Sequence, residues 1–172
     1  MDLGAALQTY FAAEKLTGLS LAIYGAVLLG AVSFVYRTHD GGFMWAFVVV
    51  LGLVGLGAVI GGSVLAVKTP PQLEHLLGLD RQALLAIEVP RMDEVNANWP
   101  RLALTWTVLI VGSLALIWFG QRDWTTGLGL ALLVAASSAM VLDIFAERRA
   151  AVYYAALVGI VTSPEHVGAA QP

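Results

Sequence analysis

The stretch from Phe43 to Val67 reads FMWAFVVVLGLVGLGAVIGGSVLAV and contains no charged residue. A helix needs about 20 apolar residues to cross the hydrocarbon layer of a bilayer. This stretch therefore predicts a transmembrane helix. Three further stretches on either side of it meet the same requirement, although the last carries an acid near its end: 16–36, 101–119 and 126–145.

The composition agrees with a membrane protein. Hydrophobic residues make up 59% of the chain and charged residues only 12%, and the mean hydropathy is +0.80. A soluble domain has about twice that share of charge. The net charge of −3 and the scattered basic residues do not suggest nucleic-acid binding. The chain has no cysteine, so disulfides and thiol chemistry are excluded.

The spans pair through short connections. Residues 37–42 and 120–125 are rich in turn-forming types, so each connection predicts an antiparallel helical hairpin. The fold class is therefore all-α, a four-transmembrane-helix bundle of two antiparallel hairpins in a single membrane domain. Residues 68–100, between the hairpins, contain four prolines and many charges, which predicts a middle loop outside the membrane.

Local helices are expected within this middle loop. Asp80 can cap a helix at its N-terminus. Pro90 removes one backbone donor, so we expect it to break or bend that helix and leave two helical pieces. In the second piece, residues 91–99, an apolar stripe suits packing on the bilayer or on the other cytoplasmic helices.

Lys and Arg residues give the orientation, because cytoplasmic flanks keep an excess of them. Seven lie on the side of the termini and the middle loop, and two lie on the other side: Lys15, Lys68, Arg81, Arg91, Arg101, Arg148 and Arg149 against Arg37 and Arg122. The sequence thus predicts a multi-pass protein of the cell inner membrane with both termini in the cytoplasm.

Both ends of the chain carry helical patterns outside the predicted spans. Residues 2–14 have apolar side chains at helical spacing, which fits either an amphipathic helix on the membrane surface or a lead-in turn of the first span. Residues 146–163 resume an apolar pattern that is too short to cross the bilayer. We expect a cytoplasmic helical tail that extends the fourth span, with Tyr153 and Tyr154 making contacts.

Small residues in the second span predict close helix packing. Gly57 and Gly61 form a small-xxx-small pair, which lets another helix backbone approach. Residues 135–139 give the fourth span a similar surface. Either surface is a candidate for an oligomer contact.

Charged residues near the cytoplasmic ends of the helices form a candidate polar cluster. Asp143 is the acid inside a predicted span, and we expect Lys15, Lys68 or Arg101 to neutralise it. Glu88, Arg91 and Glu94 have helical spacing. Such a set is either a structural ion-pair network or a binding or catalytic site. Its members are Glu14, Lys15, Lys68, Glu88, Arg91, Glu94, Arg101, Asp143 and Glu147.

Signatures of enzymes and metal sites are absent from the sequence. It has no phosphate-binding glycine loop, nucleophile elbow or paired-histidine helix. The predicted topology separates His39 from His75 and His166, so we expect no metal and no cofactor. The midpoints of the spans are apolar or small, which disfavours a proton-coupled pump.

Two short motifs, YFAAEK from Tyr10 to Lys15 and RMDEVNANW from Arg91 to Trp99, resemble a loose group of small, uncharacterised bacterial four-span membrane proteins. The resemblance implies a bacterial membrane setting and no known activity. It also singles out residues to test, namely Glu14, Lys15, Arg91, Met92, Val95, Asn98 and Trp99.

The sequence favours a non-enzymatic module that oligomerises, or that binds a partner or ligand, through its membrane and cytoplasmic helices. A small multimeric channel or carrier is the alternative. A lipid-acting enzyme at the cytoplasmic interface is a third reading, with Glu88, Glu94, Asp143 or Glu147 as acid or base. The expected partners are the lipid bilayer and a second copy or another membrane protein, with no nucleic acid.

Overall fold

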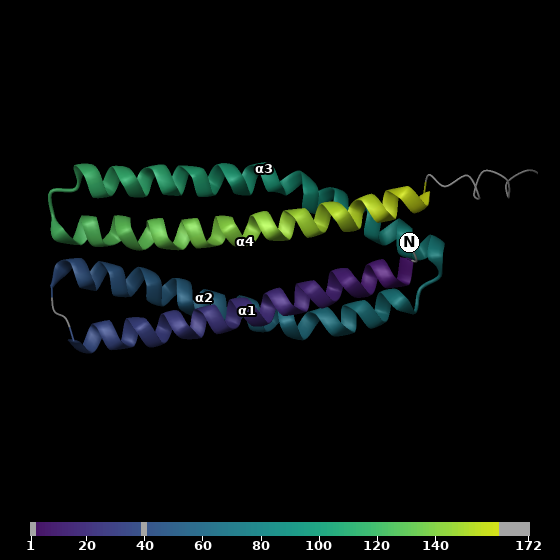
Figure 1. The fold of residues 1–172 in the computed structure, drawn as a ribbon, viewed down its shortest axis with the longest axis horizontal. Helices are drawn as coiled ribbons and strands as arrows, with labels where there is room; N and C mark the ends of the chain where they lie inside the picture. The colour runs from purple at the N-terminus through teal and green to yellow at the C-terminus, as the bar shows by residue number, and fades with distance from the viewer. Residues whose placement is uncertain (1–2, 39–40, 162–172) are drawn as a thin grey trace, which may run out of the picture.

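The computed structural model describes residues 3–38 and 41–161 and confirms the all-α, four-helix class. The chain forms α1 (Leu3–Thr38), α2 (Gly42–Leu77), α3 (Arg81–Phe119) and α4 (Asp123–Val161) (Figure 1). Each helix contains one predicted span and is long and apolar enough to cross a membrane. The 36 residues of α1 correspond to about 54 Å, well beyond the roughly 30 Å of hydrocarbon.

The middle segment is helical rather than a loop of separate pieces. Helix α2 continues through Pro70 and Pro71 to Leu77, and α3 continues through Pro90 and Pro100. The expectation of two separate helical pieces at Pro90 is therefore wrong, because α3 is continuous there. A proline removes a single backbone donor, and packing against neighbouring helices can hold the helix together around it. Only residues 78–80 separate α2 from α3.

The helix ends behave as the local sequence predicts. Asp80 caps α3, its Oδ1 accepting a hydrogen bond from the backbone N–H of Ala83 at 2.8 Å. Gly41 precedes α2 with a φ of 133°, a conformation that suits glycine. Residues 3–14 are continuous with the first span, because α1 runs without interruption from Leu3. The predicted tail likewise extends α4 as far as Val161.

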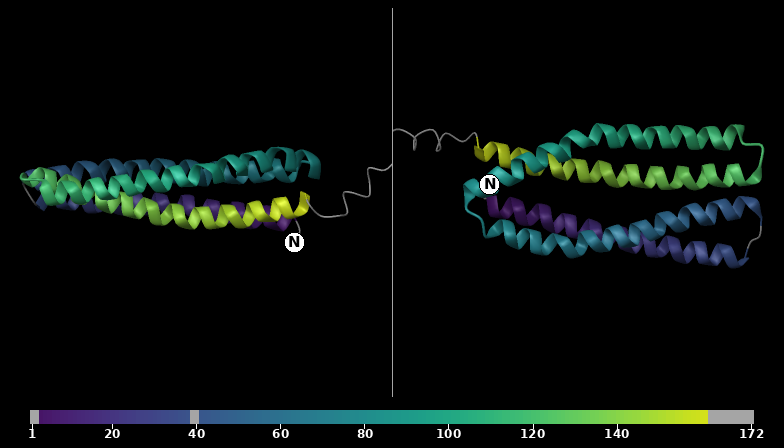
Figure 2. Two further views of the ribbon diagram at one scale, coloured as in Figure 1. Left: turned by 90° about the horizontal axis from the view of Figure 1, so that it is seen from above. Right: turned by 180° about the vertical axis from the view of Figure 1, so that it is seen from behind.

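The helices are arranged differently at the two ends of the molecule. At the end that holds the two short connections, Figure 1 shows them in a row in the order α3, α4, α2, α1. At the other end they form two layers (Figure 2). There α1 and α4 lie side by side in one layer, and the end of α2 and the start of α3 lie in the other.

The packed hydrophobic core lies in the two-layer end. We call this part the head, defined as residues 3–15, 68–100 and 146–160. Its core joins all four helices: Ala6, Leu7, Phe11, Leu76, Leu84, Met92, Ala150, Tyr153 and Leu157. The predicted spans instead leave large apolar side chains such as Ile23 and Val108 exposed. This division is expected if water surrounds the head and lipid surrounds the spans, since lipid gives no hydrophobic drive for helix association.

Glycines set the close approach of α1 to α2, but they are not the predicted pair. A Cβ on Gly25 would lie 2.5 Å from the carbonyl oxygen of Gly55, and one on Gly62 would lie 2.5 Å from that of Gly18. A Cβ on Gly57 or Gly61 would meet nothing within 4 Å. The predicted packing role of Gly57 and Gly61 within the bundle is therefore wrong, because both face outward.

Candidate functional site

The head contains a buried ion pair. Glu88, on α3, is only 1% exposed, and Arg91 one turn later holds both of its carboxylate oxygens. Nε of Arg91 donates to Oε1 at 2.9 Å, and Nη2 donates to Oε2 at 2.7 Å. The hydroxyl of Tyr153, on α4, donates to the same Oε2 at 3.1 Å. These bonds tie α3 to α4 inside the head. Nearby, the Tyr154 hydroxyl donates to Asp93.

Helix α1 closes this ion pair with aromatic rings. Tyr10 stacks on Tyr153 with ring centroids 4.4 Å apart. The guanidinium carbon of Arg91 lies 6.0 Å from the ring centroid of Tyr10 and 5.8 Å from that of Phe11. A cation near aromatic faces is attracted to their π electrons. Three helices therefore meet at one charged group.

Burial alters the acidity of the groups in this cluster. It raises the pKa of the Tyr153 hydroxyl, and the charge of Glu88 raises it further, so Tyr153 stays a hydrogen-bond donor. Burial also raises the pKa of Glu14, which Arg91 partly offsets and Glu88 reinforces. Glu14 is half-buried, whereas the Glu88 carboxylate is closed off by its partners. The arrangement fixes helix register and gives a substrate little access to Glu88.

Asp143 has a different partner from the one expected. The indole Nε1 of Trp106, on α3, donates to its Oδ2 at 2.6 Å. Within residues 3–38 and 41–160, the Glu88–Arg91 contact is the only side-chain ion pair, so the predicted pairing of Asp143 with Lys15, Lys68 or Arg101 is wrong. An indole on the facing helix satisfies the carboxylate without a second charge.

The predicted cluster therefore separates into parts. Glu14, Glu88 and Arg91 come together inside the head. Asp143 and Glu147 line a small cavity of about 30 Å³ between α3 and α4, beside Trp99 and Trp106. The remaining members have exposed side chains: Lys15, Lys68, Glu94 and Arg101.

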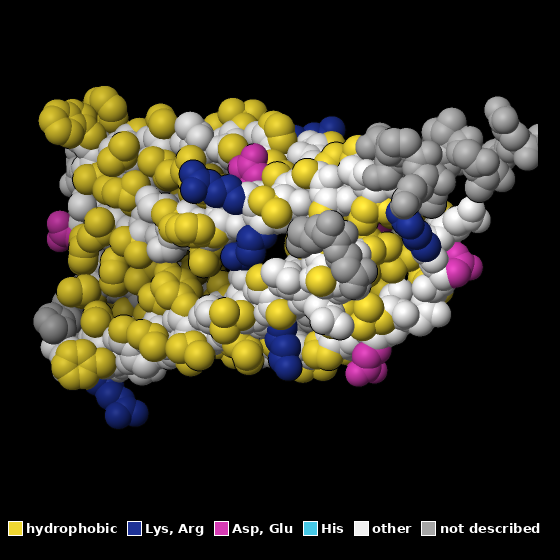
Figure 3. Space-filling view, turned by 45° about the vertical axis from the view of Figure 1, so that its right-hand side comes forward, with side chains coloured by type: hydrophobic (Ala, Val, Ile, Leu, Met, Phe, Trp, Pro, Cys, Tyr) yellow, Lys and Arg dark blue, Asp and Glu magenta, His cyan; other side chains and the backbone are white. Residues whose placement is uncertain are grey.

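A groove runs along the seam between α1 and α4. Its head part has a volume of about 270 Å³ and is lined by Tyr10, Arg148 and Arg149 among apolar side chains. A second opening of about 420 Å³ lies on the same seam among the predicted spans. Figure 3 shows Lys and Arg side chains beside a hollow near the middle of the visible face. Between the two openings, Nη2 of Arg149 donates to Oγ1 of Thr17 at 2.9 Å.

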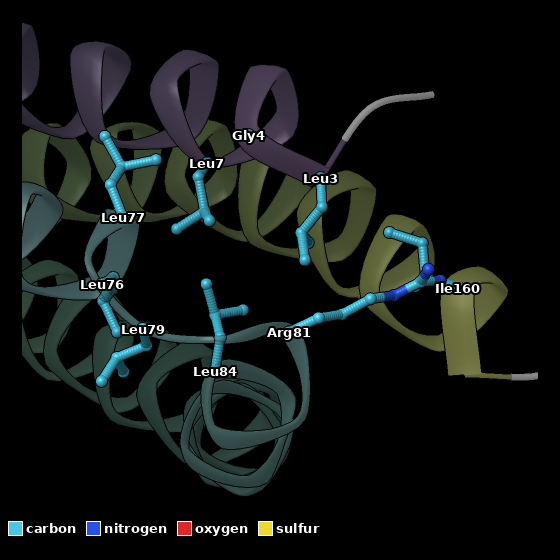
Figure 4. A pocket seen from close by; sticks show the side chains of 9 residues that line it. All are labelled: Leu3, Gly4, Leu7, Leu76, Leu77, Leu79, Arg81, Leu84 and Ile160. Atoms are coloured by element: carbon cyan, nitrogen blue, oxygen red, sulfur yellow. The ribbon is translucent and has the colours of Figure 1, made fainter.

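A further cavity of about 380 Å³ lies at the tip of the head. Figure 4 shows that leucine side chains from α1 and from both sides of the α2–α3 turn surround it, including Leu7, Leu76 and Leu84. Arg81 reaches its edge. This cavity is an extension of the apolar core and places no acid or base together.

Sequence reasoning missed several of these contacts. Tyr153 and Tyr154 make contacts, as expected, but their partners Glu88 and Asp93 were not predicted. The stacking of Tyr10 on Tyr153 was not predicted either, and Trp106 was not singled out. Arg149 entered only as a charge for orientation. The available signal was that Tyr10, Ala13 and Thr17 share one face of a helix. Which face of α4 meets it depends on how the two hairpins dock.

Neither metal-binding groups nor similarity to known proteins assigns a function to this chain. Among the described residues, no group of three His, Asp or Glu side chains could hold a metal ion. His39 and His166 lie outside those residues, so the prediction of no metal stays a prediction. Comparisons with protein-family models, curated proteins and solved structures find no match to this chain. The four long apolar helices fit a small four-span membrane protein.

Proposed function

We propose that this chain is a non-enzymatic integral membrane protein that binds a ligand at the junction of its head and its spans. In this proposal it lies in a bacterial inner membrane with the head and both termini in the cytoplasm. The open α1/α4 groove is the observation that carries the proposal. Its walls combine apolar side chains with Arg148 and Arg149, a combination typical of binding sites.

The state of the ionisable groups supports binding over catalysis. Glu88 is the most enclosed carboxylate of the candidate cluster, yet Arg91 and Tyr153 occupy its oxygens. A general acid or base must come within hydrogen-bond reach of its substrate. The opening beside Asp143 and Glu147 has a volume of only about 30 Å³, roughly the volume that one water molecule occupies in the liquid. The α1/α4 groove offers far more room.

Assembly with a second copy or another membrane protein is part of the proposal. The helices form an open row among the spans, and Gly57 and Gly61 face outward there. Gly57→Leu and Gly61→Leu should weaken any assembly through this face while leaving the folded monomer intact. Gly30→Leu is the matched control, because Gly30 on α1 also has nothing near it. If all three variants had the same oligomer size in detergent, the face that carries Gly57 and Gly61 would not be an oligomer contact.

A flux measurement tests the proposed function against a channel or carrier. The full chain is reconstituted into vesicles loaded with potassium-sensitive and pH-sensitive dyes, and protein-free vesicles serve as the control. We expect equal permeability, because the spans place no row of charged groups across the bilayer. Faster ion flux in the protein vesicles would overturn the proposal in favour of a channel. A changed lipid composition in a deletion strain, restored by wild type but not by Asp143→Asn/Glu147→Gln, would instead favour an enzyme.

A further inference from the structure

Two openings lie one after the other on the α1/α4 seam, the first in the head and the second among the spans. The lining residues of α1 follow one helix face, from Tyr10 and Ala13 above to Ser20 and Tyr24 below. Those of α4 descend in the same way from Tyr153 to Val141. Thr17 and Arg149 lie between the two sets and hydrogen-bond to each other. A long, narrow ligand that displaces this hydrogen bond would lie along the seam, parallel to the helices.

The upper part of this track has unused cationic donors. Within the described part of the chain Arg149 makes one side-chain hydrogen bond, to Thr17, and a guanidinium carries five N–H groups. Arg148, which is exposed, makes no hydrogen bond or ion pair within the described residues. Side chains on a helix lean toward its N-terminus, which for α4 is the direction of the spans. Both guanidinium groups are thereby directed toward the boundary where lipid phosphates lie.

The lower part contains hydroxyl groups inside a predicted span. The Tyr24 hydroxyl is buried and has no hydrogen-bond partner among the residues that the structure describes. A serine can turn its hydroxyl onto the carbonyl one turn earlier, as Ser33 and Ser113 do, but a tyrosine cannot reach its own helix in this way. An unpaired polar group in hydrocarbon is costly. A ligand with an oxygen acceptor at this depth would satisfy Tyr24.

The depths of these groups match the chemistry of a phospholipid. Ser20 lies three residues after Thr17, about 4.5 Å deeper. The Tyr24 side chain leans back toward the level of Ser20. The headgroup layer of a bilayer is roughly 5 to 7 Å thick on each side. A phosphate at the arginines would therefore bring the ester oxygens of its lipid close to Ser20 and Tyr24.

The neighbouring acids leave the upper end of the groove positive. Glu14 acts on Arg149 electrostatically, but it also faces Arg91 and Glu88, and burial raises its pKa. Glu147 lines the cavity toward α3, on the other side of α4. Arg148 and Arg149 thus outnumber Glu14, the acid on the α1 side of α4. The charge of the groove is complementary to an anion.

We propose that the α1/α4 groove binds an anionic phospholipid. Arg148 and Arg149 hold its phosphate, Ser20 and Tyr24 bond to its glycerol ester oxygens, and an acyl chain lies along Leu21, Val141 and Leu142. This inference rests on the proposed function, since it names the ligand of the same groove. A lipid fits better than a free anion because a second, mostly apolar opening of about 420 Å³ lies next along the seam from the positive end.

Native mass spectrometry of the full chain in detergent tests this directly. The protein is titrated with phosphatidylglycerol and with phosphatidylcholine that carries the same chains. Two arginines near the phosphate correspond to about a 30-fold preference for the anionic lipid. We expect Arg148→Gln/Arg149→Gln to remove this preference. Lys15→Gln/Lys68→Gln is the matched control, because it removes the same charge at the same level without touching the groove.

A second variant examines the deeper half of the site. Tyr24→Phe should lower the retention of both lipids by a similar factor, about threefold, because the ester oxygens are common to both. Melting temperatures establish whether each variant is folded. If the double arginine variant does not fold, the single variant Arg148→Gln is used in its place. Arg148 has no partner within the described part of the chain, so its replacement leaves the packing unchanged.

Three outcomes would overturn the inference. Equal retention of the two lipids by the wild type would show that the charge of the lipid does not contribute to binding. An equal loss in the lysine control would mean general attraction to the surface rather than a site. Displacement of phosphatidylglycerol by inorganic phosphate or glycerol phosphate would leave an anion site without a lipid. None of these outcomes affects the result expected in the flux experiment. The proposed function and this inference can therefore fail independently.

Discussion

The Tyr153 hydroxyl donates to Oε2 of Glu88 at 3.1 Å across 65 residues of sequence. The same oxygen also accepts from Arg91, so one carboxylate joins two helices and a cation. Stacking of Tyr10 on Tyr153 brings in α1. The head is thus held in register by polar contacts inside an apolar core.

Removing the charge of Glu88 should destabilise the head strongly. Glu88→Gln leaves Arg91 without its counter-charge, and we expect a loss of about 2 to 4 kcal/mol in the free energy of unfolding. The loss stays below that of a fully sealed pair because the Arg91 side chain is 28% exposed. Denaturant unfolding in detergent measures it. Glu94→Gln, at an exposed position on the same helix, should change stability by less than about 0.5 kcal/mol.

A double variant checks that reading. Glu88→Leu/Arg91→Met replaces both charges by apolar groups and should recover most of the lost stability, since no unpaired charge remains. A double variant as unstable as Glu88→Gln would show that the ion pair is not what holds the helices together.

The inward and outward glycines should respond oppositely to alanine. Gly25→Ala places a Cβ 2.5 Å from a backbone oxygen of α2, so α1 and α2 must separate. We expect a loss of about 1 to 3 kcal/mol, visible as a lower melting temperature. Gly57→Ala meets no atom within 4 Å and should be neutral or slightly stabilising, because alanine favours the helix. The same melting temperature for both variants would contradict this packing.

Trp106 and Asp143 should be energetically coupled. Trp106→Phe and Asp143→Leu each remove one side of the 2.6 Å hydrogen bond. In a double-mutant cycle we expect a coupling between about 0.6 and about 1.7 kcal/mol, the average and the maximum measured for such bonds in a membrane protein. Glu147→Leu in place of Asp143→Leu is the control, because Glu147 has no hydrogen bond within the described residues. A zero coupling for the first pair would indicate that Asp143 is satisfied by water instead.

The raised pKa of Glu14 predicts a specific pH dependence. Burial favours its neutral form in the folded head, so the folded protein binds a proton that the unfolded chain releases above its ordinary pKa of 4.5. Stability should therefore fall as the pH rises from 4.5 through the raised pKa. Glu14→Gln should flatten this fall and be at least as stable as the wild type at pH 7. An unchanged pH profile, measured by melting between pH 4 and pH 8, would exclude Glu14 as its source.

Reporter fusions test the proposed orientation. A reporter inserted in the turn at residues 78–80, or fused to the C-terminus, should read cytoplasmic, and one inserted at residues 37–42 should read external. The expectation follows from the seven-to-two distribution of Lys and Arg. An external reading at the turn would reverse the topology and would move the α1/α4 groove to the outer leaflet.

The sequence by itself determined the four long apolar helices. Runs such as Phe43 to Val67 can satisfy their backbone groups in lipid only as helices, so composition and length suffice. It also determined the cap at Asp80, which depends on residues within one turn. These features are local along the chain.

Only the tertiary structure decided which side chains meet. Helix α3 continues through Pro90, which is exposed, because Glu88 and Met92 on either side of it are buried in the head. Asp143 bonds Trp106 because α3 faces it. In the same way Gly25, rather than Gly57, lies at a helix contact. Helical spacing assigns residues to a face, but the rotation of each helix depends on the packing of all four together. The α1/α4 groove exists only after the two hairpins dock.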